Sequence, residues 1–223
     1  MVKNPRISSL CGLVNRVTGS LGYNAPPSLE TKLALANSHV TESVKILGIT
    51  PNIDLFPSRL NFQLKPYVSY KPDPEAVAID AFKLNWGKHC FYAFPLFSLI
   101  ARVLNKMQTD KATGVVIVPF WPAQTFYPIH MKVLIDKPVL LSARQTLLQL
   151  PGNPSMLHPL HEKLRLLVCK VSGTPTKAED YLIQQPTYLC HRGNQKPKRH
   201  MSNILQSGRG SLANNKLILF HHL

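Results

Sequence analysis

Three aspartates have the residue type and the spacing that a catalytic site could use. Asp54, Asp73 and Asp80 are close in sequence, and a metal-dependent nuclease needs clustered carboxylates to hold a pair of metal ions. Asp73 also lies between two prolines, in a turn where aspartate is common for reasons of local geometry. Asp80 could equally cap a helix or form an ion pair. Both a metal site and structural roles are therefore open.

Aromatic residues are concentrated in one stretch, FYAFPLFSLIARVLNKMQTDKATGVVIVPFWPAQTFYP. Phe97, Trp121, Phe126 and Tyr127 could each stack on a nucleobase, and an exposed aromatic contributes about 1–3 kcal/mol per base. Prolines flank Trp121 and Tyr127, which predicts that these two lie on a loop surface. Phe94 and Phe126 are predicted instead to pack a helix against a sheet. Trp121 and Tyr127 are therefore the predicted aromatic contacts to nucleic acid.

A basic, proline-broken run near the C-terminus, HRGNQKPKRH, is the second candidate contact. Its cationic side chains are those of Arg192, Lys196, Lys198 and Arg199. Such a run can neutralise phosphate charge, and it is also typical of nuclear-localisation signals. A solvated tail without a specific partner is the alternative.

The whole chain is strongly basic. It has 223 residues, and 26 Lys and Arg against 11 Asp and Glu give a net charge of +15. A positive field of this size favours polyanionic partners, nucleic acid before anionic membranes. No apolar run approaches the roughly 20 residues of a transmembrane helix, so no membrane association is predicted.

The cysteines and histidines do not form a recognisable metal-binding pattern. The four cysteines are scattered, His158 and His161 are three positions apart, and Cys190 adjoins His191. Neither pair completes a tetrahedral zinc set. Free thiols indicate a reducing compartment, so we expect an intracellular protein, nuclear or cytoplasmic, with no metal and no cofactor.

The elements that must position these residues are clearest in the aromatic stretch. Apolar residues recur there at helical spacing, which predicts a helix over 98–113 with Ser98 as its cap and Gly114 at its end. The apolar stripe consists of Leu99, Ile100, Val103, Leu104 and Met107. The β-branched run 115–118 has no polar alternation, which predicts a strand buried on both faces of a parallel sheet.

A helix that leads into a buried strand is half of a βαβ unit, so the predicted fold class is α/β. We expect a Rossmann-like, partly parallel sheet with flanking helices, an irregular N-terminal leader and a basic C-terminal tail. The predicted domains are 1–40, a weakly ordered leader; 41–172, the α/β domain; and 173–223, a partly disordered tail. Further strands are predicted at 52–56, 138–141, 164–171 and 215–220, and helices at 28–47 and 129–135.

Ligands of open α/β sheets bind beyond the carboxyl ends of the strands. The segments Phe94–Phe97 and Pro119–Trp121 are predicted to lie at such ends. This pattern therefore indicates where a functional site would lie, but it does not indicate what the site does.

Several motifs, in order, resemble a known family. The segments ITPNIDLFPSRLNFQLKPYVSYKPDPEAVAIDAF and FYAFPLFSLIARVLNKMQTDKATGVVIVPFWPAQTFYP resemble the pol polyprotein of DIRS-type retrotransposons, the tyrosine-recombinase class, after its reverse transcriptase and RNase H. The resemblance covers about 41–173, and the final NNKLILFHHL resembles the end of such a reading frame. It implies a fragment, or a domesticated or decayed copy, of a retrotransposon. The polymerase and RNase H carboxylates lie upstream of this segment, and the recombinase tyrosine lies elsewhere in the element.

That segment of the family is similar in turn to phage-type adenine-N6 DNA methyltransferases. The similarity implies that Asp54 lies near the methyl donor and that Phe94, Pro95, Leu96 and Phe97 correspond to the catalytic Asp/Asn-Pro-Pro-Tyr/Phe turn. Phe97 keeps the position that stacks on the flipped base. Phe94 has no acceptor for the base's amine, Leu96 replaces the second proline, and a glycine-rich donor loop is missing. Methyl transfer is therefore not expected.

Three functions are left open by the sequence. The first is a non-catalytic module that binds nucleic acid through its basic surface and loop aromatics. The second is an enzyme, either a residual methyltransferase that uses S-adenosylmethionine or a metal-dependent nuclease. The third is a decayed reading frame without a function.

Overall fold

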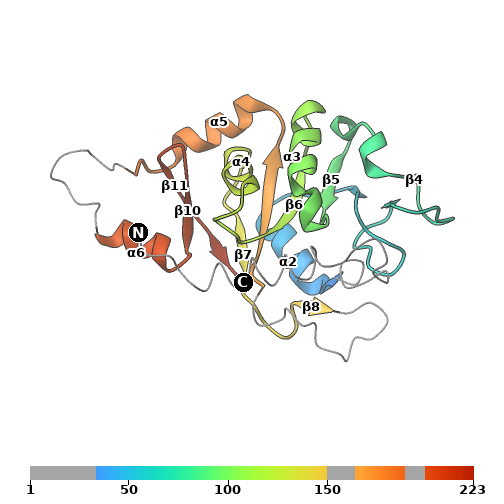
Figure 1. The fold of residues 1–223 in the computed structure, drawn as a ribbon, viewed down its shortest axis with the longest axis horizontal. Coiled ribbons are helices and arrows are strands. Elements are labelled where there is room, and N and C mark those ends of the chain that lie inside the picture. Colours follow the sequence, from blue (N-terminus) through green and yellow to red (C-terminus); the bar gives the residue numbers. More distant parts are fainter. Residues whose placement is uncertain (1–33, 150–163, 189–198) are drawn as a thin grey trace.

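A computed structural model describes residues 34–149, 164–188 and 199–223. Its centre is a six-stranded sheet with the strand order β12-β7-β9-β6-β5-β2 (Figure 1). The strands are β2 (Ile53–Asp54), β5 (Cys90–Ala93), β6 (Thr113–Pro119), β7 (Val139–Leu141), β9 (Leu166–Ser172) and β12 (His221–His222). Neighbours pair in parallel except for β9, which is antiparallel to β6 and β7. The predicted Rossmann-like α/β class is confirmed.

Helices cover both faces of this sheet (Figure 1). One face carries α3 (Ile100–Thr109), α4 (Phe126–Lys132) and α5 (Pro175–Gln184). The other face carries α2 (Asn37–Ile46) and the antiparallel pair β1 (Ala34–Leu35) and β8 (Leu148–Gln149). The side chains of β6 alternate between the two layers, so this strand is buried on both faces, as the β-branched run predicted.

Helix α3 shows which part of a helix prediction is secure. Its apolar stripe is buried, with Ile100 and Met107 both 0% exposed. Its ends differ from the prediction. A 3-10 turn, η4 (Phe97–Leu99), precedes the helix, and Leu99 occupies the N-cap position, so Ser98 is not the cap. Gly114 does not end the helix but lies in β6, where a Cβ atom would clash with Phe91 of β5.

Other predicted elements are present with shifted bounds. The helix predicted over 28–47 is described only from Asn37, and β1 precedes it. The helix predicted over 129–135 begins earlier, at Phe126. Between β2 and β5 the chain makes an excursion that contains the parallel pair β3 (Val68–Ser69) and β4 (Ala78–Ile79) and the 3-10 turns η2 (Ala81–Lys83) and η3 (Trp86–Lys88).

The described part of segment 173–223 is built into the same fold. After α5 it contains α6 (Arg199–Gln206) and the hairpin β10 (Gly210–Ala213) and β11 (Lys216–Leu219). Asn214 and Asn215 both have positive φ, as a two-residue hairpin turn with the twist of its strands requires. The following β12 pairs with β7, and Phe220 is buried in the core cluster shared with α3 and α4.

No helix in the described ranges combines the length and the apolar character needed to cross a bilayer.

Candidate functional site

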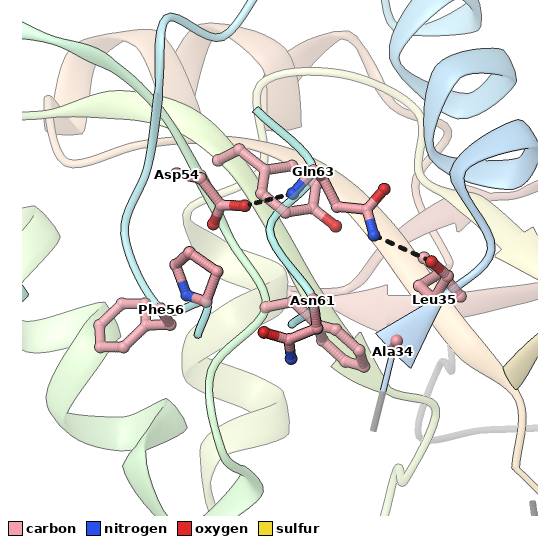
Figure 2. A pocket seen from close by; sticks show the side chains of 9 residues that line it. Ala34, Leu35, Asp54, Phe56, Asn61 and Gln63 are labelled. Carbon is pink, nitrogen blue, oxygen red and sulfur yellow. Dashed lines mark hydrogen bonds between the residues drawn. The ribbon is translucent and has the colours of Figure 1, made fainter. Parts of the chain in front are cut away.

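The site lies where the carboxyl ends of β2, β5 and β6 meet at one edge of the sheet, since these strands pair in parallel. Phe94–Phe97 directly follow β5, and Phe120 and Trp121 directly follow β6. The predicted placement of both aromatic segments at strand ends is therefore confirmed. Next to them a small pocket opens on the face covered by α2 and β1 (Figure 2).

Asp54 is the charged group of this pocket. It belongs to β2, is only 2% exposed, and its Oδ2 accepts a hydrogen bond of 2.9 Å from the Gln63 backbone N–H. Burial raises the pKa of Asp54 to about 7, although the backbone N–H groups of Gln63, Phe56 and Leu64 oppose the rise. The carboxyl group therefore holds the loop after β2 in place and titrates near neutral pH.

Gln63 and Tyr92 also line this pocket, and protein atoms cover the side-chain oxygens of both. Gln63 Nε2 donates a 2.9 Å hydrogen bond to the carbonyl of Leu35 on β1 (Figure 2), whereas its Oε1 is buried without a partner among the described atoms. The Tyr92 hydroxyl is also buried without such a partner. Burial, and the nearby charge of Asp54, raise the pKa of Tyr92 well above its ordinary value. Unpaired buried polar groups are rare and unfavourable, so each requires an explanation.

Sequence reasoning identified Asp54 but missed Gln63 and Tyr92. The sequence does contain a signal for Tyr92. Side chains alternate along β5, so Tyr92 and Phe91 point to different faces of the sheet, and the Tyr92 hydroxyl is a polar group in an otherwise apolar strand. Gln63 lies in an irregular segment, and no sequence pattern indicates its role.

The pocket has a volume of only about 10 Å³. That is about the space that one water molecule needs. Neither a flipped base nor S-adenosylmethionine fits into it.

The turn Phe94–Phe97 is apolar throughout. Pro95 is buried, Phe94 and Phe97 are partly exposed, and Leu96 is 37% exposed. The Phe97 ring packs edge-to-face on Trp121, with 5.1 Å between ring centroids. None of these side chains offers a hydrogen-bond acceptor to an amine.

The two predicted loop aromatics have different surroundings. Trp121 is partly exposed beside Phe97. Tyr127 is 3% exposed and lies inside α4, so the prediction that it lies on a loop surface is wrong. The flanking Pro128 misled the prediction, because proline is tolerated in the first turn of a helix, where the N–H groups have no intrahelical acceptor. Phe126 is buried, as predicted.

The carboxylate cluster that a metal-dependent nuclease would need does not form among the described residues, where no group of three His, Cys, Asp or Glu side chains could hold a metal ion. Asp73 accepts a 2.9 Å hydrogen bond from the Tyr67 hydroxyl, and a bond from the Glu75 N–H is the main cause that lowers its pKa. Asp80 caps η2 by accepting from the Phe82 N–H at 3.1 Å. Both have structural roles.

A cation lies at the same strand ends. The exposed Arg165 places its guanidinium 4.7 Å from the ring centroid of Phe120, and its carbonyl accepts a 2.9 Å hydrogen bond from the Phe120 N–H. Arg165 directly precedes β9, which is antiparallel to β6, so its guanidinium lies at the end of β6. The partly exposed rings of Phe97 and Trp121 follow β5 and β6. We call Phe97, Trp121 and Arg165 the aromatic-cation edge.

The structure describes only one of the four residues that were predicted to form the C-terminal contact to nucleic acid. Arg192, Lys196 and Lys198 lie outside the described residues. Arg199 is the first residue of α6, and only its backbone is described.

No protein-family model matches the chain, and no curated protein matches it.

Proposed function

We propose that the chain is a non-catalytic module of retroelement origin that binds single-stranded nucleic acid at its aromatic-cation edge. The observation on which the proposal rests is the presence of Phe97, Trp121 and Arg165 together on the solvent-accessible strand ends of a chain with net charge +15. The resemblance of 41–173 to the DIRS-type pol polyprotein supports the origin. On this proposal the protein acts inside the cell, in the nucleus or cytoplasm.

The edge has both components that single-stranded nucleic acid requires. Each aromatic ring that stacks on a base contributes about 1–3 kcal/mol regardless of sequence, because every base has a π-face. Arg165 can neutralise a phosphate, and each neutralised phosphate releases counterions and makes binding salt-dependent. The Phe97–Trp121 contact fixes both rings, so less side-chain entropy is lost on binding.

Catalysis is not part of the proposal. The turn after β5 lacks an amine acceptor, and the pocket of about 10 Å³ is too small for a base. Asp73 and Asp80 are occupied by hydrogen bonds within the excursion. These observations favour binding over methyl transfer or metal-dependent cleavage.

Fluorescence anisotropy of a labelled single-stranded DNA, titrated with the protein at a series of salt concentrations, tests the proposal. We expect affinity to fall linearly on a double-logarithmic plot as salt rises. Trp121→Ala should weaken binding about 5- to 150-fold, which corresponds to about 1–3 kcal/mol. Arg165→Ala should weaken binding and make the salt dependence less steep.

Two matched variants serve as controls. Tyr70→Ala removes a ring that is 82% exposed in the β3–β4 excursion, and Lys177→Ala removes an exposed cation on α5. Both should bind almost as the unchanged protein does. The proposal fails if no binding is detected at low salt, or if the controls lose as much affinity as the edge variants.

A further inference from the structure

A second arginine lies on an aromatic ring near the aromatic-cation edge. Arg102 is exposed on α3, and its guanidinium carbon lies 3.8 Å from the ring centroid of Phe82. Arg165 makes the same kind of contact with Phe120, at 4.7 Å. The face of a ring attracts a cation, so each contact restrains a long and otherwise flexible side chain. None of the ion pairs found in the described ranges includes Arg102.

Neighbouring aromatic residues hold Phe82 in place. Its ring centroid lies 5.4 Å from that of Phe56 and 5.9 Å from that of Trp86. Trp86 is itself 0% exposed, and its Nε1 donates a 2.8 Å hydrogen bond to the Ala81 carbonyl. The ring that carries the Arg102 guanidinium is therefore part of a packed cluster, and the position of the cation is defined before any ligand binds.

The connections of the chain place Arg102 at the same end of the sheet as the aromatic-cation edge. Phe56 follows the last residue of β2 after one intervening residue, so the Phe82 ring that packs on it lies near the carboxyl end of β2. Arg102 is in the first turn of α3, which follows the carboxyl end of β5. Arg165 lies at the end of β6, which pairs with the other side of β5. The two arginines therefore flank the strand ends that carry Phe97 and Trp121.

We propose that Arg102 is a second phosphate contact for the single strand that binds at the aromatic-cation edge, an inference that rests on the proposed function. The strand stacks bases on Phe97 and Trp121 and places one backbone phosphate on each arginine. A guanidinium that lies on a ring keeps the N–H groups of its rim, and their planar fork matches two phosphate oxygens. The ligand is an oligonucleotide, because two arginines held on separate rings take separate phosphates.

A purely structural role for Arg102 is the alternative, since its side chain covers part of the Phe82 ring. The two roles differ in what a substitution changes. Loss of a structural contact alters the stability of the fold. Loss of a phosphate contact alters the number of counterions released on binding, and therefore the dependence of affinity on salt concentration.

Fluorescence anisotropy of labelled oligothymidylate, titrated with the Arg102→Gln variant at a series of salt concentrations, tests the inference. We expect binding at low salt to weaken about tenfold, as loss of a hydrogen bond to a charged group does. The slope of log affinity against log salt should become less steep by about 0.7, the value for one phosphate contact on a single strand. Lys88→Gln is the matched control, because it removes the same charge from an exposed side chain that precedes the amino end of β5. It should leave affinity and slope almost unchanged.

The variant Arg102→Lys separates the guanidinium from its charge. Lysine keeps the charge but lacks the planar fork, so we expect the slope of the unchanged protein together with a lower affinity. The inference is overturned, and the proposed function stands, if Trp121→Ala weakens binding while Arg102→Gln behaves as Lys88→Gln does. An Arg102→Lys variant with full affinity would also overturn it. If the unchanged protein does not bind at low salt, the proposed function fails and this inference fails with it.

Discussion

Two aspartates of this chain have pKa values shifted in opposite directions because their surroundings differ. Burial raises the pKa of Asp54 to about 7, whereas Asp73 at the surface is held below its ordinary pKa chiefly by the Glu75 N–H. His130 on α4 is 0% exposed, neither of its ring nitrogens has a partner in the described structure, and burial lowers its pKa to about 4. Burial therefore favours the neutral form of both Asp54 and His130.

Asp54 and His130 should make stability depend on pH in opposite directions. The folded pKa of Asp54 is raised from 3.8 to about 7, so its contribution is lost as pH rises through that window. The folded pKa of His130 is lowered from 6.5 to about 4, so its contribution is lost as pH falls through that window. The two effects should nearly cancel between about pH 4 and 6.5.

The variant Asp54→Asn should expose the pH dependence of stability that His130 causes. We expect its free energy of unfolding to increase by about 1.4 kcal/mol per pH unit between about pH 4.5 and 6, because one proton is then released on folding. Chemical denaturation at several pH values measures this slope, and the unchanged protein is the control with a much smaller slope. Equal slopes for the two proteins would show that Asp54 is ionised in the folded state at these pH values.

Tyr92 and Tyr67 form a matched pair of buried tyrosines. Tyr67 is 0% exposed and donates to Asp73, whereas the Tyr92 hydroxyl has no described partner. Tyr67→Phe should therefore lower the free energy of unfolding by about 1 kcal/mol, and Tyr92→Phe should raise it by about 1 kcal/mol, because removal of an unsatisfied group removes its desolvation penalty. Denaturant titrations of both variants measure the two changes. A loss of stability in Tyr92→Phe would mean that its hydroxyl is satisfied in the free protein.

The residues of the site could be predicted only where their role is local. Asp54 is recognisable because an acid ends a short apolar strand. The unpaired state of Tyr92 and Gln63 is not recognisable, because it depends on β1, β2 and β5 meeting in space. Tyr127 shows the same limit, since a proline in the first turn of α4 resembles a loop signal when read without the helix.

At the scale of elements, helical period and β-branched runs predicted α3 and β6 because both signals are local. The bounds were less predictable. Gly114 resembles a helix stop in sequence, but it lacks a side chain because the backbone of β5 approaches closely there. The antiparallel direction of β9 and the pairing of β1 with β8 depend on long-range contacts, and an apolar run predicts a strand without predicting its neighbours.

The position of the site follows from the topology of these elements. Three parallel strands bring Asp54, Phe94 and Phe120 to one edge although long stretches of chain separate them. The two faces of the sheet carry different features at that edge. The acid pocket lies towards α2 and β1, whereas Phe120 belongs to the cluster with α3 and α4. The acid pocket and the aromatic-cation edge are therefore separate features of the same edge of the sheet.

For the whole molecule, the decisive feature is how the last segment joins the rest. Phe220 is 4% exposed, and its ring packs edge-to-face on Phe120 with 5.7 Å between centroids. The following β12 pairs with β7 at the edge of the central sheet. These contacts imply that 164–172 and 210–223 unfold together with the core formed by α3, α4 and β6.

Phe220→Ala tests this cooperativity. Loss of a buried phenylalanine should lower the free energy of unfolding by about 3–5 kcal/mol. If the segment unfolds with the core, the fluorescence of Trp86, which is 0% exposed and packs on Phe91 far from Phe220 in sequence, should report the whole loss. A Trp121→Phe background removes the other tryptophan of the sequence. Leu219→Ala, at a neighbouring side chain that is 39% exposed, should have a small effect. An unchanged Trp86 transition in Phe220→Ala would mean that the C-terminal segment folds independently of the sheet core, and the fold would then consist of two units.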